Sequence, residues 1–196
     1  MKIVHVIDDD DAVRDALGFL LTGRGYAAQL HESGEAFLAH SRGGRDGVIV
    51  LDIRMPGMSG IELFHELRKT QPAPPVIFLT GHGDVPLAVE AIKAGAFDFR
   101  EKPFEENAFI DAIERAFAAR DNAAGERARR AELDERAASL SPREREVMAL
   151  MLKDLPNKVI AFELGIAMRT VEVHRAKVLA KMGVRSLVSL AAMLKG

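Results

Sequence analysis

The segment Ile3-Val4-His5-Val6-Ile7-Asp8-Asp9-Asp10-Asp11 is a short apolar run that stops at four consecutive acidic residues. A run of this length and composition predicts a buried β-strand, with the acidic residues at its carboxyl end. Carboxylates crowded so closely repel one another, which favours a site where a cation offsets their charge. Acidic residues at a helix start also cap amide groups, and we expect this second role for Asp10 and Asp11.

Three later apolar runs also stop at a reactive side chain. Residues 48–51 are followed by Asp52, residues 76–79 by Thr80, and residues 97–101 by Lys102. In open parallel α/β sheets, ligands bind beyond the carboxyl ends of the strands, where loops from different strands converge. We therefore expect one pocket that contains five side chains: Asp8, Asp9, Asp52, Thr80 and Lys102.

The segments between these runs have the periodicity of amphipathic helices. Helices are expected at residues 12–21, 35–40, 60–69, 85–94 and 107–120, with one further strand at residues 27–31. Five strands that alternate with five helices predict an α/β fold of (βα)5 order. The near-continuous apolar strands indicate a doubly wound parallel sheet with helices on both faces, over residues 1–120.

The rest of the chain has a different pattern. Residues 121–138 contain Leu133 as their only large apolar side chain, which predicts a charged linker that is helical in part. A helix start at Ser141-Pro142 follows, and further helices are expected at residues 157–164, 168–182 and 186–195. These short helices predict a small all-α helix-turn-helix domain over residues 139–196.

Composition and charge narrow the class of protein. The chain has 196 residues, 48% of them hydrophobic, and no cysteine, which excludes disulfides, thiolate metal sites and a thiol nucleophile. No apolar stretch approaches the roughly 20 residues of a membrane span, and no signal peptide is evident, so we expect a cytoplasmic protein without a membrane partner. A metal at the acidic site would have hard oxygen ligands, which favour Mg²⁺.

The net charge of −2 hides an asymmetry between the two halves. Residues 139–196 carry ten Lys and Arg against five Asp and Glu, a net charge of +5, which leaves 17 basic against 24 acidic residues, or −7, in residues 1–138. An acidic domain joined to a small basic one suggests a regulatory domain attached to a nucleic-acid-binding domain.

Four stretches of the first domain resemble the receiver domain of two-component response regulators. They are Val6-Ile7-Asp8-Asp9, Leu51-Asp52-Ile53-Arg54-Met55-Pro56-Gly57-Met58-Ser59-Gly60, Leu79-Thr80-Gly81-His82 and Glu101-Lys102-Pro103-Phe104. The resemblance implies that Asp52 is a nucleophile that accepts a phosphoryl group from a histidine kinase. It also implies that Mg²⁺ is held by Asp8, Asp9, Asp52 and the backbone carbonyl of Arg54.

The same resemblance implies a switch. After phosphorylation, Lys102 and Thr80 would each contact a phosphoryl oxygen, and Phe99 would swing inward to fill the space that Thr80 leaves. The Lys102-Pro103 bond is expected to be cis. Residues 81–104 further resemble the FixJ subfamily, whose members act in low-oxygen or nitrogen-fixation control; within them we expect a conformational or hydrogen-bonding role for His82.

Segments of the second domain resemble the LuxR-type helix-turn-helix. They are Leu140-Ser141-Pro142-Arg143-Glu144-Arg145-Glu146-Val147, Asn157-Lys158-Val159-Ile160-Ala161 and Arg169-Thr170-Val171-Glu172-Val173-His174-Arg175-Ala176-Lys177. The helix at 168–182 would enter the major groove of DNA, with Val171, Val178 and Met182 facing the core. We expect phosphate contacts from Lys158, Thr170, His174 and Lys177, and base contacts from Glu172, Val173, Arg175 and Ala176.

Two residues depart from the LuxR-type pattern. Asp154 replaces a usual glycine, and Ala167 replaces a usual serine at the start of the recognition helix. Aspartate tolerates left-handed backbone less well than glycine and alanine cannot cap a helix, so we expect a less stable domain.

These features predict a transcriptional regulator that is phosphorylated on Asp52, dimerises and binds promoter DNA, with RNA polymerase as a further partner. Relief of a contact between the two domains is an equally open route of activation. A regulator that works by protein contact, independently of phosphorylation, is the alternative. A stand-alone phosphatase or phosphotransferase would also use Asp and Mg²⁺, but no second substrate pocket or general base is evident. The protein is therefore not expected to be an enzyme beyond the reaction at Asp52 itself.

Overall fold

The computed structural model describes residues 1–40, 46–81 and 85–195, so the expectation for His82 lies outside the described residues. The chain divides into two compact units, Met1–Ala123 and Ala124–Gly196, which are described separately below. No helix in the described ranges is long and apolar enough to cross a membrane.

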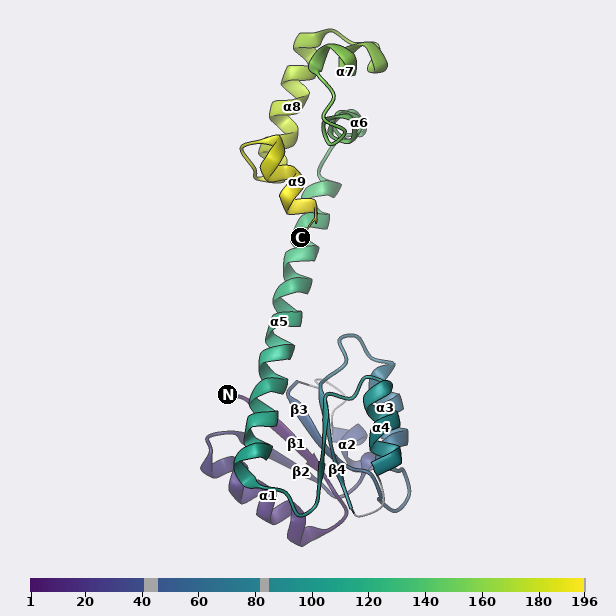
Figure 1. Cartoon of the computed structure of the whole chain (residues 1–196), viewed down its shortest axis with the longest axis vertical. Coiled ribbons are helices and arrows are strands. Elements are labelled where there is room, and N and C mark those ends of the chain that lie inside the picture. The colour runs from purple at the N-terminus through teal and green to yellow at the C-terminus, as the bar shows by residue number, and fades with distance from the viewer. Residues whose placement is uncertain (41–45, 82–84, 196) are drawn as a thin grey trace. The chain divides into compact units, whose positions relative to one another are not determined.

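The first unit contains a parallel sheet of five strands in the order β2-β1-β3-β4-β5 (Figure 1). The strands are β1 (Ile3–Ile7), β2 (Ala27–His31), β3 (Val48–Asp52), β4 (Val76–Thr80) and β5 (Asp98–Glu101). This order places β1 and β3 in the middle of the sheet, so that their carboxyl ends are adjacent. The predicted α/β fold is confirmed.

Helices cover both faces of this sheet. They are α1 (Asp11–Gly23), α2 (Gly34–His40), α3 (Gly60–Arg68), α4 (Val85–Lys93) and α5 (Glu106–Ala138). Side chains alternate between the two faces of a strand, so Val48 and Val50 pack with α1 and α5, whereas Ile49 and Leu51 pack with α2, α3 and α4 (Figure 1). The three inner strands β1, β3 and β4 therefore each contribute to two hydrophobic cores, which explains their near-continuous apolar sequences.

Helix α5 is much longer than the helix expected at residues 107–120. It continues to Ala138, through the segment interpreted as a linker. The extension is rich in Ala, Glu and Arg, which are strong helix formers. Ion pairs one turn apart add support, with 3.5 Å between Arg130 and Asp134 and 2.6 Å between Glu132 and Arg136.

The second unit is helical, as predicted. Beyond the end of α5 it contains α6 (Pro142–Met151), α7 (Asn157–Leu164), α8 (Met168–Met182) and α9 (Leu187–Lys195). Val171, Val178 and Met182 of α8 are fully buried in one core, so the expected inward face of this helix is confirmed. The start of α6 carries the expected capping box, in which Ser141 and Glu144 bond each other's backbone N–H groups.

Both departures from the LuxR-type pattern have structural consequences. Asp154 has a φ of 58°, the left-handed conformation that glycine adopts without strain. Ala167 is the N-cap of α8 and provides no side-chain hydrogen bond to the helix start. At these two positions the backbone geometry therefore suits the usual residues, glycine at 154 and serine at 167, better than the residues in this chain.

Candidate functional site

Three of the expected pocket residues meet at the carboxyl edge of the sheet. Asp8 follows β1, Asp52 ends β3 and Lys102 follows β5. The ammonium nitrogen Nζ of Lys102 lies 2.6 Å from Oδ2 of Asp8 and 2.6 Å from Oδ1 of Asp52. Asp8 and Asp52 are buried, with 1% and 8% of their surface exposed. Two buried carboxylates are thus joined by one cation that is partly open to solvent.

Burial and charge pairing set the protonation of this cluster. Burial raises the pKa of the Asp52 carboxyl, and the hydrogen bond from Lys102 lowers it without offsetting that rise. Burial alone would lower the pKa of Lys102, but the hydrogen bonds to Asp52 and Asp8 outweigh it, and the net shift is upward. Lys102 is therefore firmly charged and supplies the positive charge of the site.

The other acidic residues of the first cluster have distinct positions. Asp10 is the N-cap of α1 and accepts a hydrogen bond from the backbone N–H of Ala12 at 2.9 Å. Asp11 lies in the first helical turn and forms an ion pair with Arg14. Asp9 is exposed and lines a hollow of about 650 Å³ beside the loop that follows β3. Of the four consecutive acidic residues, Asp10 and Asp11 thus lie at the start of α1, and Asp8 and Asp9 lie at the pocket.

The donor atoms of the site fit Mg²⁺ in their chemistry, because all are carboxylate or backbone oxygens. Within the described ranges, no group of three or more His, Asp or Glu side chains is arranged to hold a metal. Mg²⁺ commonly takes one or two protein carboxylates and completes its shell with water and phosphate oxygens. Asp8 and Asp52 could supply such a pair.

The loop between β3 and α3 is tightly closed. The backbone N–H of Gly60 donates to the carbonyl of Ile53 at 3.0 Å, and a Cβ at Gly60 would lie 2.0 Å from the carbonyl oxygen of Asp52. Only glycine permits this approach. The backbone N–H of Arg54 donates to Oδ2 of Asp52 at 2.7 Å, so the loop also orients the carboxylate.

Thr80 and Phe99 lie near the site. Among the described residues, neither forms a hydrogen bond with Asp52. Thr80 is fully buried at the end of β4, and its hydroxyl donates to the carbonyl of Gly81 at 3.0 Å. Phe99 is half-buried in β5 and packs against the core formed with α2, α3 and α4. The Lys102-Pro103 bond is cis, as expected.

Two residues that the sequence did not single out contact the site from helices. Arg14 of α1 donates from its guanidinium to the backbone carbonyl of Asp8 at 2.6 Å. Glu35 of α2 accepts a hydrogen bond from the backbone N–H of Met58, in the loop after β3, at 2.9 Å. Both bonds join a side chain to a backbone atom, and backbone atoms carry no sequence signal.

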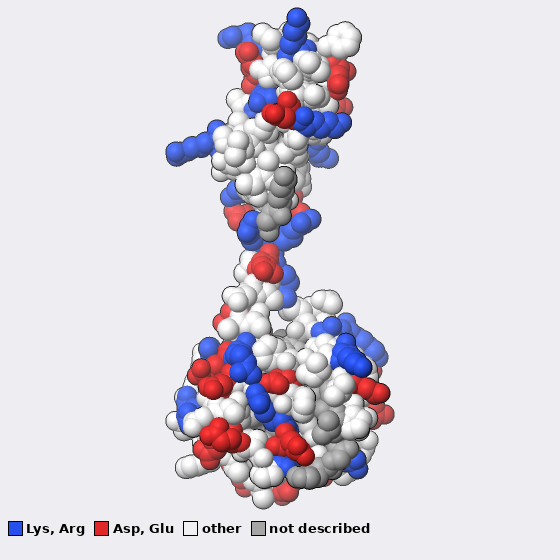
Figure 2. Space-filling model, viewed as in Figure 1, with Lys and Arg blue, Asp and Glu red and all other residues white. Residues whose placement is uncertain are grey.

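In the second unit, the residues expected to contact DNA are accessible. Exposed side chains are Lys158 on α7 and, on α8, Thr170, Glu172, Val173, Ala176 and Lys177; His174 and Arg175 are partly buried. Lys and Arg side chains project from several sides of this unit (Figure 2). The exposed α8 residues lie outside the buried stripe of Val171, Val178 and Met182, whereas His174 and Arg175 flank that stripe.

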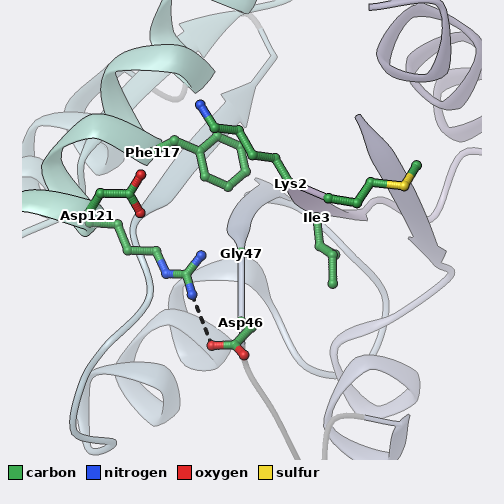
Figure 3. Close-up of a pocket in the computed structure, with 8 residues that line it drawn as sticks. Lys2, Ile3, Asp46, Gly47, Phe117 and Asp121 are labelled. Atoms are coloured by element: carbon green, nitrogen blue, oxygen red, sulfur yellow. Dashed lines mark hydrogen bonds and ion pairs between the residues drawn. The ribbon is translucent and has the colours of Figure 1, made fainter. Parts of the chain in front are cut away.

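A separate hollow of about 380 Å³ lies where β1 and β3 begin, at the opposite edge of the sheet from Asp52 (Figure 3). Three of its charged groups have partners: Arg120 pairs with Asp46 at 3.0 Å, and the Lys2 ammonium lies 5.0 Å from the centre of the Phe117 ring. This hollow contains none of the residues expected to react.

The fold and the carboxylate–lysine cluster together define a receiver-type signalling domain, followed by a helix-turn-helix DNA-binding domain. Comparison with protein families agrees: residues 4–114 match the response regulator receiver domain, and residues 138–194 match the bacterial regulatory proteins of the luxR family. The chain belongs to the FixJ-like two-component response regulators. The receiver implies a histidine kinase as partner, and the luxR-type domain implies DNA binding.

Relatives match over nearly the whole chain. The transcriptional regulatory protein FixJ of Rhizobium meliloti is 50% identical over 97% of this chain and 93% of its own length. The C4-dicarboxylate transport transcriptional regulatory protein DctR of Rhodobacter capsulatus is 53% identical over 97% and 98%. Among solved structures, the response regulator StyR is 43% identical, with a TM-score of 0.88 over 99% of this chain and 98% of that one.

Proposed function

We propose that the protein is a transcriptional regulator that is switched on when Asp52 accepts a phosphoryl group from a histidine kinase. The observation that carries this proposal is the buried Asp52 carboxylate, paired with Lys102 at 2.6 Å beside the carboxylate of Asp8. A nucleophile beside a fixed cation and a possible metal ligand is what phosphoryl transfer to a carboxylate requires.

In the transfer step, an oxygen of Asp52 forms a bond to phosphorus while the bond from phosphorus to the kinase histidine breaks. The electron pair of the broken bond stays on the imidazole, which takes up a proton from solvent. Lys102 exchanges its bond to Asp52 for one to a phosphoryl oxygen. Asp8, Asp9, Asp52 and the carbonyl of Arg54 would hold Mg²⁺, which neutralises phosphoryl charge when bound.

The phosphorylated receiver then pairs with a second copy of itself. Thr80 turns toward the phosphoryl group, Phe99 moves inward, and the surface of α4 changes. Leu87, Val89 and Ile92 of α4 are 38%, 42% and 39% exposed, which supports this helix as an apolar contact surface. A homodimer places two helix-turn-helix domains on two half-sites of promoter DNA, where RNA polymerase is a further partner.

Helix α8 would read the promoter. Lys158, Thr170, His174 and Lys177 contact phosphates and orient the helix, whereas Glu172, Val173, Arg175 and Ala176 contact base edges. Most of these side chains are exposed, which supports their availability for contacts with DNA.

The regulated process is proposed to be a low-oxygen or nitrogen-fixation response, on the basis of the 50% identity to FixJ. Control of C4-dicarboxylate transport is a second candidate, because DctR is 53% identical. Promoter occupancy across the genome, with and without phosphorylation, distinguishes these two candidate processes, because the occupied promoters identify the regulated genes.

The proposal is tested by treating the full chain with phosphoramidate and Mg²⁺ and mapping the modified residue by mass spectrometry. We expect one phosphoryl group per chain, on Asp52, and none on the Asp52→Asn variant. Absence of modification in the wild type would favour the phosphorylation-independent regulator. Turnover far beyond one equivalent per chain would favour an enzyme.

A further inference from the structure

We propose that Glu35 is a positioning residue for the Mg²⁺-dependent reaction at Asp52, acting through the loop between β3 and α3. Glu35 lies on α2, outside the pocket, and does not touch the reacting carboxylate. Its role would be to hold the loop that carries the Arg54 carbonyl in place. This inference deepens the proposed function and rests on it.

The contact is made at the tip of the loop. Oε1 of Glu35 accepts the backbone N–H of Met58 at 2.9 Å. The neighbouring Gly57 has a φ of +74°, and a Cβ added there would lie 2.9 Å from the same Oε1. Gly34, next to Glu35, also lies close to the loop, because a Cβ there would lie 3.2 Å from Sδ of Met58. The start of α2 is thus packed directly against the loop.

Further hydrogen bonds hold the loop near its base. The N–H of Gly60 bonds the carbonyl of Ile53, and the N–H of Arg54 bonds Oδ2 of Asp52. Between them, Met55, Pro56, Gly57 and Met58 cross from the pocket to α3. Among the described residues, the Glu35 carboxylate supplies the side-chain hydrogen bond that links α2 to this crossing, so its loss would loosen the segment that is joined directly to the Arg54 carbonyl.

The Glu35 carboxyl is ionised at neutral pH and can therefore accept the Met58 N–H at all times. Hydrogen bonds from its own backbone N–H and from Met58 N–H lower the pKa of its carboxyl, so the group stays charged at neutral pH. A hydrogen bond from a backbone N–H to a carboxylate is stronger than one to a neutral acceptor. Residues that orient metal ligands from outside typically change metal affinity about 10- to 100-fold when they are removed.

The test compares three variants of the full chain. Glu35→Ala removes the acceptor, Glu35→Gln keeps an oxygen that can accept from Met58, and Glu32→Ala removes a nearby exposed carboxylate that has no hydrogen bond or ion pair among the described residues. Two quantities are measured: hydrogen exchange of the Met58 amide, and the Mg²⁺ concentration that gives half-maximal phosphorylation by phosphoramidate, alongside the maximal rate.

For Glu35→Ala we expect faster exchange at Met58 and a half-maximal Mg²⁺ concentration raised about tenfold, with the maximal rate changed less than the Mg²⁺ requirement. Glu35→Gln should recover most of both effects, and Glu32→Ala should behave as the wild type. Gly57→Ala, which places a methyl group against Oε1 from the loop side, should reproduce the Mg²⁺ effect.

Unchanged Mg²⁺ dependence in Glu35→Ala, together with faster Met58 exchange, would overturn the positioning role. Equal loss of maximal rate and Mg²⁺ affinity in both Glu35 variants would also overturn it, because it would indicate a general loss of structure. A wild type that is not phosphorylated at all would instead refute the proposed function, while the exchange measurement would still report whether Glu35 anchors the loop.

Discussion

Nζ of Lys102 lies 2.6 Å from Oδ1 of Asp52, so the proposed nucleophile is paired with a cation before any phosphoryl group arrives. The same ammonium group is bonded to Asp8. The lysine therefore offsets the repulsion between two buried carboxylates at the carboxyl ends of neighbouring strands. When Asp52 is phosphorylated, Lys102 would replace its bond to the Asp52 oxygen by a bond to a phosphoryl oxygen.

Replacing this lysine should destabilise the receiver. Lys102→Met leaves Asp8 and Asp52 buried without a cation, and we expect a loss of about 2 kcal/mol in EDTA, less than for a fully buried pair because Lys102 keeps some exposure. Mg²⁺ should restore much of the loss. Urea unfolding followed by the fluorescence of Tyr26, the only tyrosine in a chain without tryptophan, reports the receiver alone.

The matched control is Lys69→Met, which removes an exposed lysine paired with Glu66 on α3. It should change stability by less than about 0.5 kcal/mol, with or without Mg²⁺. Equal stability of Lys102→Met and the wild type in EDTA would show that the carboxylates do not need this cation.

Much of this site could be predicted from the sequence because its residues follow apolar strands. Parallel strands place their carboxyl ends at one edge, so Asp8, Asp52 and Lys102 were expected together and are found together. Glu35 and Arg14 could not be predicted, because each bonds a backbone atom, which any residue type would offer. The length of α5 was also missed: its extension buries little apolar surface, and periodicity detects only helices that do.

The histidines of β1 and β2 should make the receiver sensitive to acid. Burial, followed by the nearby charges of His5 and His40, lowers the pKa of His31 to about 4. In the unfolded chain a histidine binds a proton near its ordinary pKa of 6.5. Protons therefore favour the unfolded state, and stability that is complete above about pH 6.5 should fall progressively toward pH 4.

Urea unfolding of the full chain at about pH 7 and about pH 5, followed by Tyr26 fluorescence, measures this slope. His31→Gln, which cannot be protonated, should lose less stability between the two pH values than the wild type. An identical loss in both proteins would exclude His31 as the source.

Two substitutions should stabilise the DNA-binding domain. Asp154→Gly relieves a left-handed backbone and should add about 0.5–1 kcal/mol. Ala167→Ser gives α8 the N-cap that it lacks and should add about 1 kcal/mol. The free energy of opening, from hydrogen exchange of the α8 amides, measures both effects. Ala180→Ser, in the interior of the same helix, should not stabilise; if it matches Ala167→Ser, capping is not the cause.

Two residues of α8 should affect DNA binding in different ways. Arg175→Ala should cost about 1–3 kcal/mol and relax the preference for one base pair. Lys177→Ala should weaken binding to all sequences alike. It should also reduce the slope of log affinity against log salt concentration by about one. Fluorescence anisotropy on a promoter fragment and on random DNA, at several salt concentrations, separates the two. If both variants lose affinity equally on both DNAs, the division into base and phosphate contacts is wrong.

The central claim is that phosphorylation of Asp52 drives two copies of the chain together on DNA. Sedimentation velocity of the full chain, with and without phosphoramidate and Mg²⁺, tests it most directly when wild type and Asp52→Asn are compared. We predict a shift toward dimer on treatment of the wild type and no shift in Asp52→Asn. A variant that dimerises on treatment as the wild type does would contradict the claim.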